Sequence, residues 1–319
     1  MKDLTKGKIS TLILGFAIPV FLGNLLQLTY SLADTRIVGS FLGERSLAAV
    51  GATTTISNLI VGFLLGLANG FAIITAQKFG AGDKKRVRRS FAIALVLGVI
   101  VSAILILIGT VFINPILRFL NVPGKLFIEA KQYILIIIIG LWVTMFYDIL
   151  MAVMRAIGDT LTPLLILAIS VGLNIVLDLL FVAVWKTGTW GAAAATVLAQ
   201  FIALVICCFY MIHKYELLRL NKNDFKDLES KMIKEMLATG MSMGFMSSLV
   251  NIGSLTLQTA INKLGQEIIV AHTAARKITE IYMIMFSVFG QTMATFCGQN
   301  MGAGKVDRIK KGMKLAIIY

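Results

Sequence analysis

The sequence predicts an all-α protein, a polytopic helical bundle in a membrane that is built from two parallel six-helix repeats. Three observations support this fold class. The chain is 58% hydrophobic and 14% charged, with a mean hydropathy of +0.87, whereas soluble domains carry about 25% charged residues. Apolar runs long enough to cross a bilayer as helices follow one another along the chain. Finally, the motifs that follow the second and the eighth run match each other, which indicates an internal repeat.

The apolar runs define the predicted helices, which cover 9–36, 46–76, 90–113, 126–154, 163–185, 190–213, 234–262, 267–297 and 308–319. The last run is too short to span a bilayer. We therefore expect further helices beyond Tyr319 and an incomplete second repeat. The first run is too long for a signal peptide, and no small-residue cleavage site follows it, so we expect it to remain as the first helix.

The distribution of charge predicts the orientation of the chain. Most of the 30 Lys and Arg residues fall in segments that share one side of the membrane, namely 1–8, 78–89, 214–234 and 305–314. This positive-inside bias predicts a multi-pass protein of the plasma (inner) membrane with a cytoplasmic N-terminus. We assign the net charge of +14 to contacts with the anionic headgroups of the lipid bilayer, not to nucleic acid.

The internal repeat divides the chain into parts. Gln77 aligns with Gln299, and the turn Gly80-Ala81-Gly82 aligns with Gly302-Ala303-Gly304, at an offset of 222 residues. Six helices return the chain to its starting side, so the two repeats have the same orientation. We predict an N-lobe over 1–213, a cytoplasmic linker over 214–233 and a partial C-lobe over 234–319.

The first predicted helix carries a polar stripe at helical spacing, formed by Asn24, Gln27, Tyr30, Ser31 and Asp34. Gln27 and Tyr30 are candidate cavity and substrate residues. Pro19 lies in the same helix and frees the carbonyl of Gly15, so we expect either a hinge or a static kink there.

The second helix holds Gly62, Gly66 and Gly70 at four-residue spacing, a pattern that lets two helix backbones approach closely. Its role is expected to be packing. The three cysteines lie in predicted helices without metal-binding spacing, and we expect them to pack as well.

Three later helices add further candidates. Asp148 lies about 10 Å from the inner end of the fourth helix, where it either lines a cavity and attracts cations or pairs with Arg155. Asn251 and Gln258 share one polar face of the seventh helix and are candidate substrate contacts. In the eighth helix, Arg276 and Glu280 are four residues apart and are expected to neutralise each other.

The strongest candidate site combines side chains from three helices. Asn174 and Asp178 share one helix face. Counted from the outer ends of their helices, Asp34, Asp178 and Thr196 each lie about 8 to 10 Å deep, and Asn174 lies one turn deeper. A carboxylate in lipid is costly unless it faces protein or water, which makes such residues functional candidates. Two carboxylates, an amide and a hydroxyl in one layer could share a proton or surround Na⁺, a hard cation that prefers oxygen ligands. The alternative is a packing hydrogen bond between helices.

These motifs together resemble the multidrug and toxic compound extrusion (MATE) family. The resemblance covers the whole chain and rests on Asp34-Thr35, Gly80-Ala81-Gly82 with its repeat, Arg155 to Thr160, and Asn174 to Asp178. It implies twelve helices in two lobes, and export of cationic, amphipathic small molecules by antiport with H⁺ or Na⁺. It also implies an N-lobe ion site at Asp34, Asn174, Asp178 and Thr196, and bending of the first helix at Pro19. Some branches carry an acidic residue in the seventh helix, which this chain lacks.

The sequence therefore predicts a secondary active multidrug exporter that works by alternating access, as a monomer and without a cofactor. A flippase for a lipid-linked cell-envelope precursor is the alternative. A flippase would need cationic groups in its cavity, for which only Arg276 and Lys277 could serve. An intramembrane aspartyl protease is excluded, because Asp148 and Asp159 are about 16 Å apart along one helix and a catalytic dyad needs hydrogen-bond reach. The sequence contains no Walker A motif, so it gives no indication that ATP is the energy source.

Overall fold

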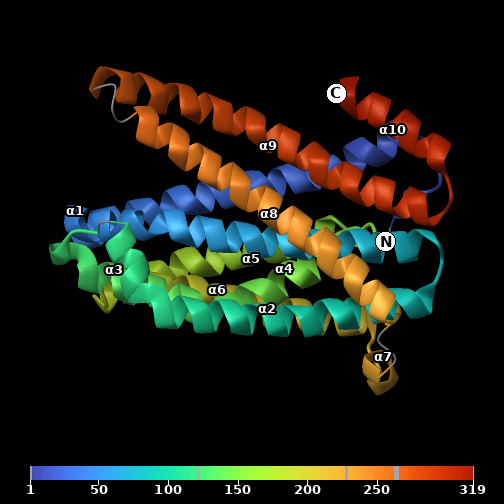
Figure 1. Cartoon of the computed structure of the whole chain (residues 1–319), viewed down its shortest axis with the longest axis horizontal. Helices are drawn as coiled ribbons and strands as arrows, with labels where there is room; N and C mark the ends of the chain where they lie inside the picture. Colours follow the sequence, from blue (N-terminus) through green and yellow to red (C-terminus); the bar gives the residue numbers. More distant parts are fainter. Residues whose placement is uncertain (1, 121, 227–228, 262–265, 319) are drawn as a thin grey trace.

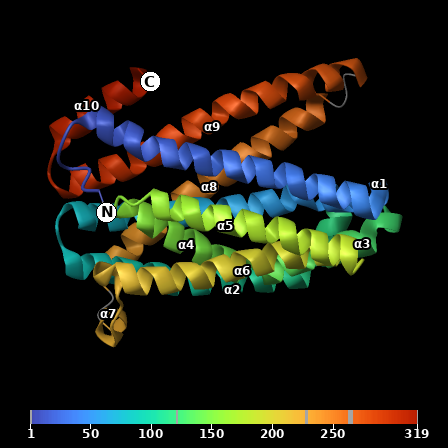
Figure 2. The ribbon, with the colours of Figure 1, turned by 180° about the vertical axis from the view of Figure 1, so that it is seen from behind.

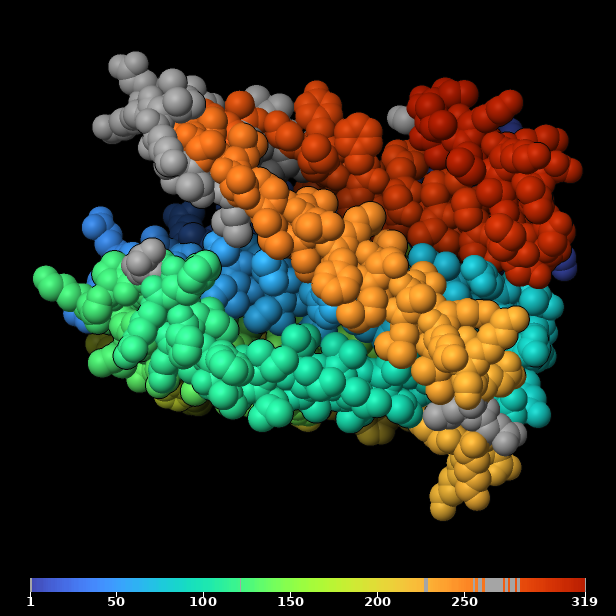
Figure 3. Space-filling view, in the orientation of Figure 1, coloured from blue at the N-terminus to red at the C-terminus, as the bar shows by residue number. Residues whose placement is uncertain are grey.

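The computed structural model describes residues 2–120, 122–226, 229–261 and 266–318, and these residues form helices joined by short connections, with no strand among them. Figure 1 shows α1 (Ile9–Gly80) and α2 (Lys84–Phe119) running along the length of the molecule, with α8 (Ser230–Ile261) and α9 (Gln266–Gly302) inclined to them, and Figure 3 shows α8 crossing this face obliquely. The prediction of an all-α bundle is therefore confirmed. The N-terminus, the start of α2, α7 and the turn before α10 lie at one end of the bundle, which we call the N-terminal end.

The first two predicted helices form one element, α1 (Ile9–Gly80), that reverses direction in the middle. Figures 1 and 2 show its two halves lying side by side. Only Gly43 departs from helical dihedrals, with φ 82° and ψ 176°. A residue with a side chain would be strained at this positive φ, so glycine permits the reversal. The backbone remains helical through Pro19.

The third and fourth predicted runs are both helical, but their bounds differ from the prediction and the fourth is divided. Helix α2 covers Lys84–Phe119, and the side chain of its N-cap residue Asp83 accepts a hydrogen bond from the backbone N–H of Arg86. The predicted run 126–154 is divided into α3 (Gly124–Ile139) and α4 (Leu141–Ala156), which are bent by 45° at Gly140. A Cβ on Gly140 would lie 2.5 Å from the side chain of Val197 in α6 (Thr189–Lys214), so the absence of a side chain on Gly140 allows close packing there.

Helix α5 (Leu161–Asp178) continues into a π-helical segment, η1 (Leu179–Val184), and α6 covers Thr189–Lys214. A π-helical turn in an α-helix often marks a functional site, and here it begins directly after Asp178. The polar segment after α6 contains the short helices η2 (Glu216–Leu218) and α7 (Lys222–Lys226). Helices α8 (Ser230–Ile261), α9 (Gln266–Gly302) and α10 (Val306–Ile318) complete the described chain.

By length and composition, four described helices could cross a membrane, namely α1, α2, α5 with η1, and α6. The bent pair α3 and α4 makes a fifth if it is one span. Since α1 contains two of the predicted runs, this set covers the first six. The long helices α8 and α9, which match the seventh and eighth runs, are not in the set.

The small-residue pattern of the second predicted helix packs against α8. A Cβ on Gly66 would lie 2.5 Å from the carbonyl oxygen of Met243, and one on Gly70 would lie 2.5 Å from the Cα of Gly240. Both distances are too short for a real side chain. The two helix backbones therefore touch directly, as the glycine spacing predicts.

The two repeats also meet each other at the N-terminal end. A Cβ on Gly80 would overlap the carbonyl oxygen of Gln299, and a Cβ on Gly302 would overlap that of Gln77. Gly302 is the repeat of Gly80, and Gln299 is the repeat of Gln77. The glycine of each repeat therefore contacts the equivalent glutamine of the other repeat, which is the contact pattern of a two-fold axis.

Candidate ion and substrate site

Asp178 lies at the end of α5 and is fully buried, with 0% of its surface exposed. In the part of the chain that the structure describes, neither of its carboxylate oxygens has a hydrogen-bond partner. Asn174, one turn earlier on the same face, is 3% exposed, and its amide oxygen also has no partner there. Buried polar atoms of this kind are costly and call for a functional explanation.

Helices α1 and α6 bring the other predicted residues to this place. Asp34 of α1 is close enough to Asp178 for their carboxylates to interact electrostatically. Thr196 of α6 lies 3.4 Å from the amide nitrogen of Asn174 and 3.2 Å from the hydroxyl of Tyr30. The structure thus gathers Asp34, Asn174, Asp178 and Thr196 around one point, with Tyr30 beside them.

Tyr133 of α3 belongs to the same neighbourhood, although sequence reasoning missed it. Its hydroxyl interacts electrostatically with both Asp34 and Asp178. Its ring packs on a small apolar cluster that includes Ile37 and Val182. The available signal was a polar side chain near the outer end of the fourth apolar run.

This arrangement can hold a proton or a small cation. The carboxylates of Asp178, which is fully buried, and of Asp34, which is half-buried, repel each other unless a positive charge lies between or beside them. The neighbouring amide and hydroxyl groups offer further oxygen atoms, which suit a hard cation such as Na⁺. No group of three His, Cys, Asp or Glu side chains gathers anywhere in the described residues, so a cation here would have two carboxylates and neutral oxygens as ligands.

Two adjoining pockets extend from this site toward the N-terminal end of the bundle. The first has an empty volume of about 390 Å³, including its open mouth, and is lined by Tyr30, Asn174, Thr196 and Gln200, among others. The second has an empty volume of about 600 Å³, including its open mouth, and is lined by polar residues of three helices: Asn24, Gln27, Tyr147, Asp148, Arg155 and Gln291. Gln27, Tyr147 and Leu167 line both pockets. A polar route therefore leads from Asp148 to Asn174.

Asp148 and Arg155 carry opposite charges into the second pocket. They interact electrostatically, yet no ion pair within 4.0 Å joins them in the described structure. The guanidinium of Arg155 instead donates a hydrogen bond of 3.3 Å to the side chain of Asn69. The geometry therefore agrees in part with each of the two alternatives predicted for Asp148. The Asp148 side chain lines the cavity, and it also lies near Arg155.

The remaining candidates are placed less centrally. Pro19 lines the second pocket. Asn251 of α8 faces α1, where its amide nitrogen lies 3.4 Å from the carbonyl oxygen of Asn58. The side chains of Gln258, Arg276, Lys277 and Glu280 lie outside the part of the structure that can be described.

A helical membrane bundle with an internal parallel repeat and a buried ionisable site between its helices is the architecture of a secondary transporter. Comparison with known proteins identifies the family. The family model described as MatE matches residues 19–180 and 242–319, and the chain belongs to this family. It is therefore a multi-pass membrane transporter and not an enzyme.

Several curated relatives are named as drug transporters. The chain is 30% identical over 311 residues to "Probable multidrug resistance protein YpnP" of Bacillus subtilis, covering 96% of this chain and 68% of that protein. It is 26% identical to "Probable multidrug resistance protein NorM" of Thermotoga maritima, covering 95% and 66%. A "FAD transporter" of Shewanella oneidensis is 24% identical, covering 100% and 72%. The chain thus spans about two thirds of the length of these relatives.

Solved structures share the fold. One described as the outward-facing conformation of a multidrug resistance MATE family transporter has a TM-score of 0.91 at 24% identity, covering 99% of this chain and 70% of that one. A MATE structure in complex with Br-NRF has a TM-score of 0.85 at 25% identity, covering 99% and 74%.

Proposed function

We propose that this protein exports cationic, amphipathic small molecules from the cytoplasm in exchange for H⁺ or Na⁺. The proposal assigns ion coupling to Asp34, Asn174, Asp178 and Thr196, and places the N-terminal end of the bundle in the cytoplasm of a cell with a plasma (inner) membrane. The observation that carries it is the pairing of the fully buried carboxylate of Asp178 with the half-buried carboxylate of Asp34, because two such neighbouring charges are stabilised by a positive charge.

The two polar pockets supply the substrate route in this proposal. Asp148 offers a negative charge to a cationic compound at the cytoplasmic end, and Gln27 and Tyr30 line the path toward the carboxylate pair. Binding of the ion from outside changes the charge around Asp34, and α1 responds by bending near Pro19. The transporter works as a monomer, and the two repeats rock about their shared contact to expose the site to one side and then to the other.

Reconstitution of the intact transporter into liposomes tests the coupling site. We expect Asp178→Asn to reduce drug antiport to the level of protein-free liposomes, because an amide cannot bind and release the coupling ion. Separately imposed pH and Na⁺ gradients tell which ion drives transport by the wild type. Glu44→Gln is the matched control, since Glu44 is an exposed acid of α1 without a hydrogen bond or ion pair to the described residues.

Unchanged antiport by Asp178→Asn would reject the site. Movement of a lipid-linked precursor, with no drug antiport under either gradient, would instead favour the flippase.

A further inference from the structure

The segment before α1, residues 2–7, lies across the N-terminal end of the bundle, and we call it the N-terminal strap. Leu4 is only 1% exposed and belongs to an apolar cluster with Phe16 of α1 and Phe296 of α9. Within the strap, the carboxylate of Asp3 accepts hydrogen bonds from the backbone and hydroxyl of Thr5 at 2.9 and 2.6 Å. The strap is therefore a built part of the structure and not a loose terminus.

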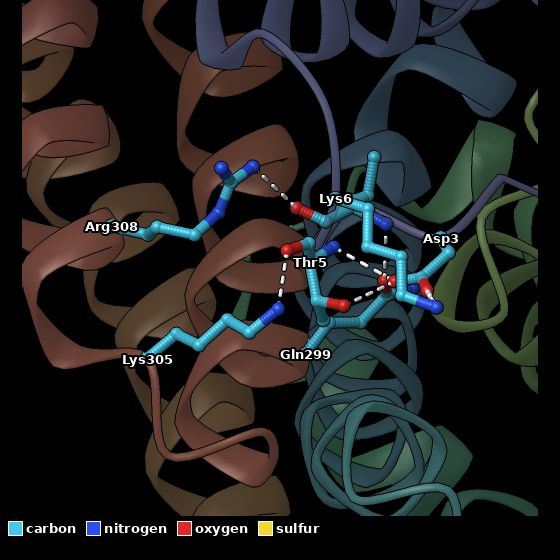
Figure 4. A network of polar contacts seen from close by, with 7 residues as sticks. Asp3, Thr5, Lys6, Gln299, Lys305 and Arg308 are labelled. Carbon is cyan, nitrogen blue, oxygen red and sulfur yellow. Dashed lines mark hydrogen bonds and ion pairs between the residues drawn. The ribbon is translucent and has the colours of Figure 1, made fainter.

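The strap is held on one side by α9, α10 and the turn between them (Figure 4). The side-chain oxygen of Gln299 accepts a hydrogen bond of 2.9 Å from the backbone N–H of Leu4. Asn300 donates to the carbonyl of Leu4 at 3.2 Å. Lys305 donates to the carbonyl of Thr5 at 2.8 Å, and Arg308 donates to that of Gly7 at 3.0 Å.

The other side of the strap touches the end of α4. The backbone N–H of Lys2 donates to the carbonyl of Gly158 at 3.2 Å. Gly158 has φ 81°, and a Cβ there would overlap the carbonyl oxygen of Lys2, so only glycine leaves room for the strap. Gln299 completes the bridge, because its amide nitrogen donates to the carbonyl of Ala156 at 2.7 Å. One buried side chain thus joins the strap, α4 and α9.

A second connection between the two repeats lies at the equivalent position of the first repeat, and it is made by ion pairs. In the first repeat, Arg86 and Arg89 of α2 form ion pairs of 3.5 and 3.3 Å with Glu229, which directly precedes α8. Arg86 is the repeat equivalent of Arg308, and Glu229 is the equivalent of Gly7. Arg86 of the first repeat therefore contacts the segment before α8, which begins the second repeat. Arg308 of the second repeat contacts the segment before α1, which begins the first repeat.

We propose that the N-terminal strap is a cytoplasmic latch. It fastens the inner ends of α4, α9 and α10 together while the ion site is open to the outside. It must detach from Gln299, Asn300, Lys305 and Arg308 before the polar pockets can open to the cytoplasm. The strap stays with the first repeat during this change, because it is covalently continuous with α1. This inference rests on the proposed alternating access.

Distance measurements between spin labels test the latch in the intact transporter. The native Cys207, Cys208 and Cys297 are first replaced by alanine. Nitroxides are then attached at Lys85→Cys on α2 and Lys311→Cys on α10, both exposed and outside the latch. We expect Arg308→Gln or Gln299→Met to increase the population with a long distance between these labels roughly fivefold, because each change removes hydrogen bonds made only in the latched state.

Lys310→Gln is the matched control, because it removes one positive charge from an exposed position of the same helix and should leave the distances unchanged. Lys305→Gln, which removes a single hydrogen bond, serves if the stronger variants fail to fold. Unchanged distances in every folded latch variant, or an equal change in Lys310→Gln, would overturn the latch. If the distances change as expected while Asp178→Asn transports normally, the latch stands and the proposed coupling site fails.

Discussion

Asp159 shows how one residue fixes the turn between α4 and α5. Its carboxylate accepts hydrogen bonds from the hydroxyl of Tyr215 and from the backbone and hydroxyl of Thr162, the last two at 3.1 and 2.9 Å. Burial favours the neutral acid, but these hydrogen bonds outweigh it and hold the pKa of Asp159 below its ordinary value. Asp159, adjacent to the strap-binding Gly158, is thus structural, and the protease reading of this residue has no support in the geometry.

We expect Asp159→Asn to destabilise the protein by roughly 1 kcal/mol at pH 7, because an amide accepts weaker hydrogen bonds than a carboxylate. The stabilisation by Asp159 is complete above the unfolded pKa of about 4. It is lost as the pH falls through the lower folded pKa. Thermal unfolding in detergent should therefore separate variant and wild type at pH 7 and bring them together in strong acid. A constant difference at every pH would contradict this account.

That most residues of the candidate site lie together could be predicted from the sequence. Asp34, Asn174, Asp178 and Thr196 are polar side chains at one calculated depth in apolar helices, and depth is simple arithmetic once the helix ends are known. Tyr133 and the contact of Arg155 with Asn69 were not predicted. Both depend on how α3 and α4 rotate about their axes and on the bend at Gly140, and rotation is set by packing between helices.

At the scale of elements, the backbones of α1 and α8 pack in direct contact, and substitution of the glycines tests this packing. We expect Gly66→Ala to cost roughly 1 to 3 kcal/mol, because the new methyl group would overlap the backbone of Met243 and force the helices apart. Gly51→Ala is the matched control in the same helix. A Cβ there would meet nothing within 4 Å, and alanine favours a helix over glycine by up to about 1 kcal/mol. Unfolding temperatures should therefore move in opposite directions, and a loss for Gly51 equal to that for Gly66 would contradict the packing argument.

The helix ends were harder to predict than the helices themselves. Hydropathy locates each helix well, because it identifies the segments that are long and apolar enough to cross the bilayer. It does not report a reversal such as Gly43, where two helices join without a loop, or the π-helical turn after Asp178. The strap was also outside the reach of hydropathy. Residues 2–7 are short and polar, and their order comes from partners about 300 positions later in the sequence.

At the scale of the whole molecule, the repeat explains why two connections close the N-terminal end. The offset that aligns Gln77 with Gln299 also aligns Gly80 with Gly302, and each of these glycines contacts the glutamine of the other repeat. The sequence alone predicts the repeat. Only the three-dimensional structure shows that each repeat contacts the segment that precedes the first helix of the other repeat. Such an exchange makes the N-terminal end a single unit, since neither repeat can move away without breaking both connections.

The ion pairs at Glu229 give a prediction for the second connection. We expect Glu229→Gln to raise the population with a long distance between labels at Lys85→Cys and Lys311→Cys. The rise should be smaller than for Arg308→Gln, because partly exposed ion pairs contribute only about 0.2 to 1 kcal/mol. Glu216→Gln is the control, since Glu216 is an exposed acid of the same linker without an ion pair in the described structure.

Combining the two changes tests whether the connections act on one equilibrium. Free energies of separated, independent groups add, so the double variant Arg308→Gln and Glu229→Gln should shift the ratio of long to short distances by the product of the two single shifts. High salt should reproduce the Glu229→Gln effect in the wild type, because it screens partly exposed charges. A Glu229→Gln variant that opens no further than wild type would mean that the ion pairs only anchor the linker, leaving the strap as the latch of this end.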